Sequence, residues 1–136
     1  HARIVWDGAW APHSHMFATA SRDKSVKIWT LVDDAQRPYR LVTTLNASDA
    51  VVSVAWASDS ALAMGLEKGD VLLYTWARDG TWQLHTTLER HHTGPVHRVA
   101  CRPDGRWMDA YDHVPYQLLS VGDDGCTRLV SWYIDS

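Results

Sequence analysis

Residues 18–29 constrain the fold of this chain more than any other part of the sequence. They read Ala-Thr-Ala-Ser-Arg-Asp-Lys-Ser-Val-Lys-Ile-Trp, which is a short strand, a polar turn and a second strand ending on a tryptophan. Apolar and β-branched residues that alternate on both sides of such a turn favour a β-hairpin. We therefore expect antiparallel sheet near the start of the chain.

The surroundings of this hairpin recur along the chain. Trp10 lies in Ala-Trp-Ala-Pro, Trp56 in Ala-Trp-Ala-Ser and Cys101 in Ala-Cys-Arg-Pro, at intervals of about 45 residues. A period of this length, with four strands in each unit, is typical of the blades of a β-propeller. The sequence therefore predicts an all-β partial propeller of three four-stranded blades, at residues 1–45, 46–90 and 91–136.

Alternating apolar residues and turn residues divide each unit into strands, and no segment has the pattern of a helix. The third unit carries about ten extra residues around 106–116, between its first two strands. Because this insertion is aromatic, we expect it either to contact a partner or to fold over its own blade. The predicted strands are 4–10, 16–21, 26–31 and 39–45, then 51–56, 61–66, 71–76 and 82–88, then 96–101, 117–121 and 127–133.

Composition and charge restrict the classes of function. The net charge of −3 gives no basic footprint for a phosphate backbone, so direct nucleic-acid binding is not supported. Two cysteines are typical of a reducing compartment, and we expect the cytoplasm, with the nucleus as a second location. No apolar run approaches the roughly 20 residues of a membrane span. The sequence starts in mid-motif, so we expect a piece of a longer protein.

The sequence does not favour a metal site, a cofactor or an enzyme. The His13-x-His15 spacing and the His91–His92 pair fall in turns, without a cysteine or carboxylate at zinc-ligand spacing. Cys101 and Cys126 have no predictable base beside them. No phosphate-cradling glycine loop, nucleophile elbow or metalloprotease motif is present.

Two motifs resemble the WD-repeat family. The segment 91–96, His-His-Thr-Gly-Pro-Val, is similar to the loop that opens a WD repeat, and 21–29 is similar to its closing hairpin. In this family a histidine, a serine or threonine, an aspartate and a tryptophan form a buried hydrogen-bonded tetrad. The resemblance assigns His1, Thr19 or Ser21, Asp23 and Trp29 to the first unit, and His92, Ser120 and Asp124 to the third.

The tetrad is incomplete outside the first unit. The third unit has Val130 at the tryptophan position, and the second has Tyr74 there and no histidine in its opening loop. We expect such degenerate blades to stack through apolar contact.

A narrower resemblance rests on residues 3–12, Arg-Ile-Val-Trp-Asp-Gly-Ala-Trp-Ala-Pro, and continues in 65–71 and 122–128. These segments resemble the last blades of the second propeller in the Elongator subunit 2 family. The resemblance implies a seven-bladed ring and a non-catalytic scaffold. It also implies partners, namely the largest and the catalytic subunits of a complex that modifies wobble uridines of tRNA. The alternatives are a WD-repeat adaptor of another assembly, such as a ubiquitin-ligase receptor or a trafficking coat, and a propeller enzyme with a metal in its channel.

Partners of a propeller dock on loops held by a rigid scaffold, and aromatic and arginine side chains supply most of the binding energy. The candidate partner-binding residues are Arg22, Trp56, Trp107 and Tyr111. Three blades cannot close a ring, so each end is expected to present an uncovered apolar face. Remaining blades of the same protein, or another chain, are expected to cover these faces.

Overall fold

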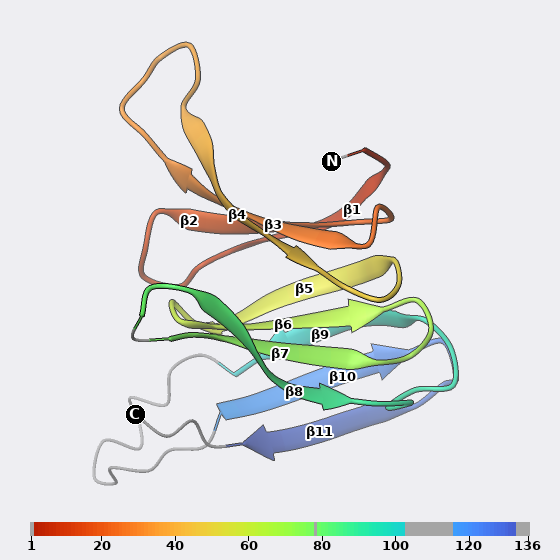
Figure 1. Ribbon diagram of the computed structural model, residues 1–136. Coiled ribbons are helices and arrows are strands. Elements are labelled where there is room, and N and C mark those ends of the chain that lie inside the picture. The colour runs from red at the N-terminus through yellow and green to blue at the C-terminus, as the bar shows by residue number, and fades with distance from the viewer. Residues whose placement is uncertain (1, 78, 103–115, 133–136) are drawn as a thin grey trace, which may run out of the picture.

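The chain folds into strands joined by turns and loops, without a helix in the described residues (Figure 1). The computed structural model describes residues 2–77, 79–102 and 116–132. The strands are β1 Val5–Trp10, β2 Met16–Ser21, β3 Ser25–Leu31, β4 Tyr39–Asn46, β5 Val51–Ser58, β6 Ala61–Leu66, β7 Val71–Trp76, β8 Trp82–Leu88, β9 Val96–Cys101, β10 Tyr116–Gly122 and β11 Thr127–Trp132.

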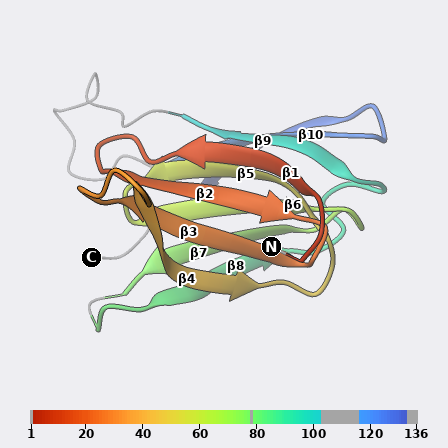
Figure 2. The ribbon, with the colours of Figure 1, turned by 90° about the horizontal axis from the view of Figure 1, so that it is seen from above.

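The strands form three antiparallel sheets in chain order. Sheet 1 is β1-β2-β3-β4, sheet 2 is β5-β6-β7-β8, and sheet 3 is β9-β10-β11. The sheets stack as successive layers in Figure 1, and sheet 1 lies over sheet 2 in the view of Figure 2. This architecture confirms the predicted all-β partial propeller. Sheet 3 has three strands within the described residues, which correspond to the three strand segments predicted for this unit, although a complete blade was expected to have four. The blade boundaries stay predictions.

The turn between the second and third strands of each sheet requires one residue with a positive φ. Lys24 has a φ of 68°, Gly69 of 105° and Gly125 of 76°. Glycine adopts this left-handed region without steric cost, which accounts for its presence in two of the three turns. The turns are therefore encoded locally, as the polar spacers in the sequence indicate.

Sheet 2 is covered on both faces, and this explains its apolar sequence. All six residues of β6 are buried. Leu62 and Met64 belong to the core shared with sheet 1, whereas Ala63 belongs to the core shared with sheet 3. A strand covered on both sides reads as a continuous apolar run, because neither face meets water.

The two cores pair small side chains with large ones. Ala18 and Ala20 of sheet 1 share a buried cluster with Leu62 and Met64 of sheet 2, so large side chains fill the space that the alanines leave. Gly65 marks a close approach of sheet 3, since a Cβ there would lie 2.7 Å from a methyl carbon of Val96 in β9.

Hydrogen bonds connect the first strands of neighbouring sheets. The Val54 N–H donates to the Asp7 carboxylate at 3.1 Å, and the Trp56 indole N–H donates to the Ala9 carbonyl at 3.0 Å. Between sheets 2 and 3, the Ser53 hydroxyl donates to the Val96 carbonyl at 3.0 Å. Because β1, β5 and β9 are held side by side in this way, the layers are anchored along their first strands.

Among the described residues, none packs over the outer faces of sheets 1 and 3. Leu119 and Val121 of β10 are exposed and Leu129 is 66 % exposed, although residues at matching places in sheet 2 are buried. Trp10 pairs with Phe17 at the end of sheet 1 and is 64 % exposed. The described part of the chain therefore leaves both terminal faces open, as the sequence predicts.

Trp10 and Trp56 occupy the same place in sheets 1 and 2. Replacing each by phenylalanine therefore compares the loss of an exposed indole with the loss of a buried one. Trp56→Phe is expected to lower the free energy of unfolding by about 1–2 kcal/mol, because it removes a buried hydrogen bond and part of a well-packed ring. Trp10→Phe should change it by less than about 0.5 kcal/mol. Urea unfolding followed by circular dichroism measures both, and equal losses would contradict the burial difference.

Candidate functional sites

A buried hydrogen-bond network joins the opening loop of sheet 3 to its β10–β11 turn. His92 Nδ1 lies 3.0 Å from Asp124 Oδ1, and His92 Nε2 lies 2.9 Å from the Ser120 hydroxyl oxygen. The Asp124 carboxylate also accepts hydrogen bonds from the Thr93 and Cys126 backbone N–H groups. One carboxylate thus ties a strand, a loop and a turn together.

The three side chains are hydrogen-bonded in the same order as in a Ser-His-Asp catalytic triad. A substrate could not reach the serine, however, because the network is buried. Ser120 is 0 % exposed and His92 is 1 % exposed. A Cβ added at Gly122 would lie 2.3 Å from His92 Nδ1, so backbone encloses the imidazole. A nucleophilic serine must reach its substrate, and the geometry therefore holds a loop in place rather than performing chemistry.

The first unit divides its candidate residues between two arrangements. The Trp29 indole N–H donates to the Thr19 hydroxyl at 3.0 Å. The Ser21 hydroxyl donates to the Ile4 carbonyl at 2.9 Å and accepts from the Asp23 N–H at 3.1 Å. The Asp23 carboxylate accepts from the Ser25 hydroxyl and from the Ala2 N–H. Thr19, rather than Ser21, is therefore the partner of the tryptophan, and His1 lies outside the described residues.

The second unit replaces the polar network by apolar contact. Met64 is fully buried at the place of Thr19, and Tyr74 takes the place of Trp29. The Tyr74 hydroxyl donates to the Asn46 carbonyl at 3.4 Å, and burial raises the pKa of Tyr74. Sheets 1 and 3 pack against the two faces of this unit, and these apolar contacts stabilise it in the absence of a tetrad.

The His92 network predicts a loss of stability in acid. The hydrogen bond from His92, with those from Thr93 and Cys126, holds the pKa of Asp124 well below its ordinary value of 3.8. A depressed carboxyl pKa stabilises the fold above the unfolded-state value, and this contribution is lost as the pH falls below it. The melting temperature of the wild type should therefore drop more steeply from pH 5 to pH 2 than that of Asp124→Asn. Parallel pH profiles for the two proteins would contradict this prediction.

The candidate partner-binding residues fall into three situations. Arg22 is exposed in the β2–β3 turn. Trp56 is 7 % exposed and packs between sheets 1 and 2, so the structure gives it a packing role in place of the expected partner contact. Trp107 and Tyr111 lie outside the described residues.

An aromatic cluster on the outer face of sheet 1 was not apparent from the sequence. The Phe17 ring lies 5.2 Å from Trp10, 6.3 Å from Trp29 and 6.0 Å from Tyr39, measured between ring centroids. The Trp29 and Tyr39 rings meet edge to face at 5.5 Å. The sequence offers one indication of this cluster, namely aromatic residues in neighbouring strands. Predicting that their rings meet also requires the register of the strands.

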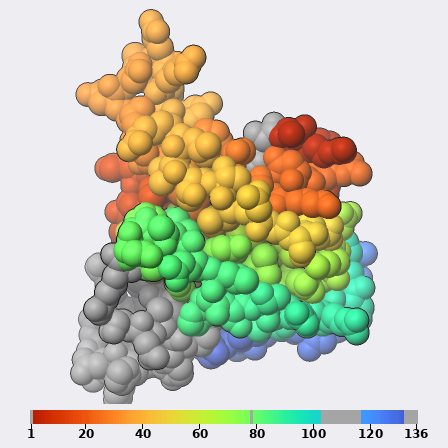
Figure 3. Space-filling model, viewed as in Figure 1, coloured from red at the N-terminus to blue at the C-terminus, as the bar shows by residue number. Residues whose placement is uncertain are grey.

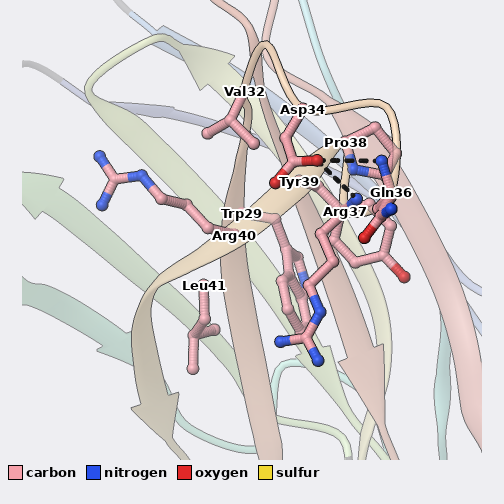
Figure 4. A pocket seen from close by; sticks show the side chains of 9 residues that line it. All are labelled: Trp29, Val32, Asp34, Gln36, Arg37, Pro38, Tyr39, Arg40 and Leu41. Carbon is pink, nitrogen blue, oxygen red and sulfur yellow. Dashed lines mark hydrogen bonds between the residues drawn. The ribbon is translucent and has the colours of Figure 1, made fainter.

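A pocket of about 640 Å³ opens beside this cluster, at the base of the β3–β4 loop (Figure 4). The loop is closed by a hydrogen bond from the Val32 N–H to the Pro38 carbonyl at 2.8 Å. The Asp34 carboxylate accepts from the Gln36 N–H at 2.9 Å. The pocket is lined by Trp29, Val32, Asp34, Gln36, Arg37, Pro38, Tyr39, Arg40 and Leu41.

Other reactive side chains do not form a site in the described ranges. Burial raises the pKa of the Cys101 thiol to about 12, which suppresses the nucleophilic thiolate. Burial also lowers the pKa of His91, with His92 and Arg128 contributing. Across residues 2–77, 79–102 and 116–132, no three His, Cys, Asp or Glu side chains are grouped to hold a metal ion. The same residues contain no helix long and apolar enough to cross a membrane.

Comparison with known proteins gives consistent matches. The family described as "WD domain, G-beta repeat" matches residues 1–30 and 82–131. Elongator complex protein 2 of Schizosaccharomyces pombe is 33 % identical over 96 % of the chain, and that of Arabidopsis thaliana is 34 % identical over 97 %. The protein of the same name from Dictyostelium discoideum is 38 % identical over 99 % of the chain.

The chain spans only 17–18 % of the length of these relatives. Their similarity nevertheless extends over nearly all of this chain, including the three stacked sheets. The match to a repeat family agrees with the repeat period and with the three stacked sheets. The chain therefore belongs to the WD-repeat family, and over nearly its whole length it is similar to Elongator complex protein 2.

Proposed function

We propose that this chain is part of a non-catalytic WD-repeat scaffold that assembles protein subunits of the Elongator complex. The observation that carries the proposal is the similarity to Elongator complex protein 2 along nearly the whole chain. The buried His92 network supports it, because the serine beside the histidine has no access to substrate. Rigid sheets that present loops at their ends suit a scaffold for partners.

The finer part of the proposal concerns partners and process. The largest and the catalytic subunits of the complex are the proposed partners, and modification of wobble uridines in tRNA is the proposed process. The proposed location is the cytoplasm, with the nucleus as a second location. The remaining blades of a seven-bladed ring are the proposed neighbours of the open faces on sheets 1 and 3, since both faces carry exposed apolar side chains.

Co-purification tests the assembly. The full-length protein carrying an affinity tag should recover the largest and the catalytic Elongator subunits at near-equal amounts, as judged by quantitative mass spectrometry. Recovery of ubiquitin-ligase or coat components in their place would favour the adaptor alternative and contradict the proposal.

Single substitutions then locate the contact. Alanine variants of Arg22, Trp107 and Tyr111 are expected to reduce recovery of at least one subunit while leaving the melting temperature unchanged. Full recovery by all three would remove these residues from the proposed interface without affecting the assembly itself.

A further inference from the structure

In sheets 1 and 2, the first strand carries one side chain that reaches the sheet that follows it. In sheet 1 this is Asp7, which accepts a hydrogen bond from the Val54 N–H of β5 at 3.1 Å. In sheet 2 it is Ser53, which donates to the Val96 carbonyl of β9 at 3.0 Å. One position of the first strand thus holds the sheet that comes next.

Strand register places Arg98 at the same position in sheet 3. The matching pairs between first and second strands are Asp7–Ala20, Ser53–Gly65 and Arg98–Val121. Arg98 is exposed, and no carboxylate of the described residues forms an ion pair with it. The sheet that would receive this side chain is not among the described residues.

The outer face of sheet 3 is bulkier than the face that sheet 2 turns toward sheet 3. At Gly65 a Cβ would lie 2.7 Å from a methyl carbon of Val96, so β9 approaches β6 too closely for any larger residue. In sheet 3, Val121 takes the place of Gly65, and Leu119 takes the place of Ala63. A sheet packed over β10 therefore needs a wider spacing at this place. The wider spacing suits an arginine where sheet 2 has a serine.

Burial decides which group must lie opposite Arg98. Ser53 is 0 % exposed beneath sheet 3, so a sheet packed in the same way over sheet 3 would take much of the Arg98 guanidinium out of water. A guanidinium only donates hydrogen bonds, and a buried charge is stable only when it is paired. A carboxylate supplies both the opposite charge and two acceptor oxygens in matching geometry. The backbone carbonyl that suffices for Ser53 supplies no charge.

The rest of the outer face suits a further sheet of the same kind. In Figure 3 the blue atoms of β10 and β11 lie at the lower edge of the stack. Leu129 is 66 % exposed there, whereas Leu73, at the matching place in sheet 2, is 1 % exposed. The chain spans only 17–18 % of the length of its relatives, which leaves ample sequence for another sheet on this face.

We propose that Arg98 pairs with a carboxylate on the first strand of the sheet that follows sheet 3 in the full-length protein. This ion pair joins the two sheets at the position that Asp7 and Ser53 use in the other two contacts. The inference rests on the proposed ring of further blades and names the group that binds at the outer face of sheet 3. A second copy of the protein on this face is the competing occupant.

The first experiment measures whether Arg98 is covered. Phenylglyoxal modifies accessible guanidinium groups, and the full-length protein is treated without other subunits. Arg98 should react about tenfold or more slowly than Arg22, because a covered guanidinium reacts only when its contact opens locally. Arg22 is the matched control, since it is exposed in the β2–β3 turn and not on a face between sheets. Equal rates would show that the outer face of sheet 3 is open, and this would overturn the proposal.

The second experiment identifies the group beside Arg98. In full-length Arg98→Lys, a water-soluble carbodiimide joins the new lysine to a carboxylate in direct contact, and mass spectrometry of the digest locates the link. We expect a link to an Asp or Glu outside residues 1–136 of the same polypeptide. A mixture of isotope-labelled and unlabelled protein distinguishes a link within one molecule from a link between two. The control variant Arg22→Lys should not link to the same carboxylate.

A third measurement does not need the lysine variant to fold. In full-length Arg98→Gln, backbone amides of β10 should exchange hydrogen about tenfold or more faster than in the wild type, because the carboxylate is left buried without its partner. Arg22→Gln removes the same charge from an exposed turn and should exchange as the wild type. Glutamine can still donate to a backbone carbonyl, so unchanged exchange in Arg98→Gln would reject the carboxylate.

Three cross-linking results would also overturn the proposal. They are a link between two molecules, a link to a carboxylate of the described residues, and the absence of a link although Arg98 is protected. Co-purification of the Elongator subunits is scored separately with the wild-type protein. Its failure would contradict the proposed assembly but leave the Arg98 contact standing, because closure of the ring does not depend on which subunits the ring binds.

Discussion

Replacing Gly69 by alanine is expected to lower the free energy of unfolding by about 3–5 kcal/mol. Gly69 has a φ of 105°, in the left-handed region, and a Cβ there would lie 1.9 Å from the His92 carbonyl oxygen. Its own carbonyl accepts from the His92 N–H at 3.0 Å. The added methyl group therefore strains one turn and pushes apart two backbone segments that cannot repack. Urea unfolding followed by circular dichroism measures the loss.

Gly125→Ala is the matched control for this substitution. Gly125 occupies the same place in its turn, with a φ of 76°, but a Cβ there would meet no atom of the described residues within 4 Å. Gly125→Ala should therefore lower the free energy of unfolding only by the cost of the left-handed backbone conformation, about 1–2 kcal/mol. If the two variants lost the same amount, the close contact between the β6–β7 turn and the opening loop of sheet 3 would be refuted.

Removing the His92 side chain is expected to cost about 3–5 kcal/mol. His92→Ala leaves the Ser120 hydroxyl without its 2.9 Å partner and the Asp124 carboxylate without its imidazole. It also opens a cavity at a site that is 1 % exposed. Both effects act in the folded state, so the variant should melt at a markedly lower temperature than the wild type.

His97→Ala provides the comparison, because His97 makes a similar contact in water. Its Nε2 lies 3.0 Å from Asp123 Oδ1, and its side chain is 55 % exposed. Exposed ion pairs contribute about 0–1 kcal/mol, so this variant should unfold close to the wild type. If His97→Ala lowered the free energy of unfolding as much as His92→Ala, burial would not explain why the His92–Asp124 contact matters more than the His97–Asp123 contact.

Much of the fold followed from local patterns. The prediction of a strand over 61–66 matches β6 residue for residue, because apolar residues between two polar turns leave little choice of structure. The same holds for 71–76 and 82–88. The sequence also predicted that His92, Ser120 and Asp124 belong together. Each of these residue types stands at a recognisable place in a loop, a strand or a turn.

Period-2 patterning was insufficient where two candidates share a face. Thr19 and Ser21 lie two residues apart on β2, so alternation places both on the same side of sheet 1. Only the pairing of β2 with β3, in which Phe17 faces Trp29, puts the Thr19 hydroxyl within reach of the indole. The sequence likewise did not predict the pocket beside Arg37, because the pocket depends on which aromatic rings fill the end of each sheet.

The sequence by itself determined the strands, the turns and the repeat, because these depend on residues close together in the chain. Tertiary structure alone decided which of the repeated positions meet water. Trp10 and Trp56 both stand between alanines at the end of a first strand, yet one is 64 % and the other 7 % exposed. The difference arises because sheet 1 covers Trp56 and nothing in the described chain covers Trp10. The burial of these two tryptophans depends on the neighbouring sheet, and their similar local sequences do not distinguish them.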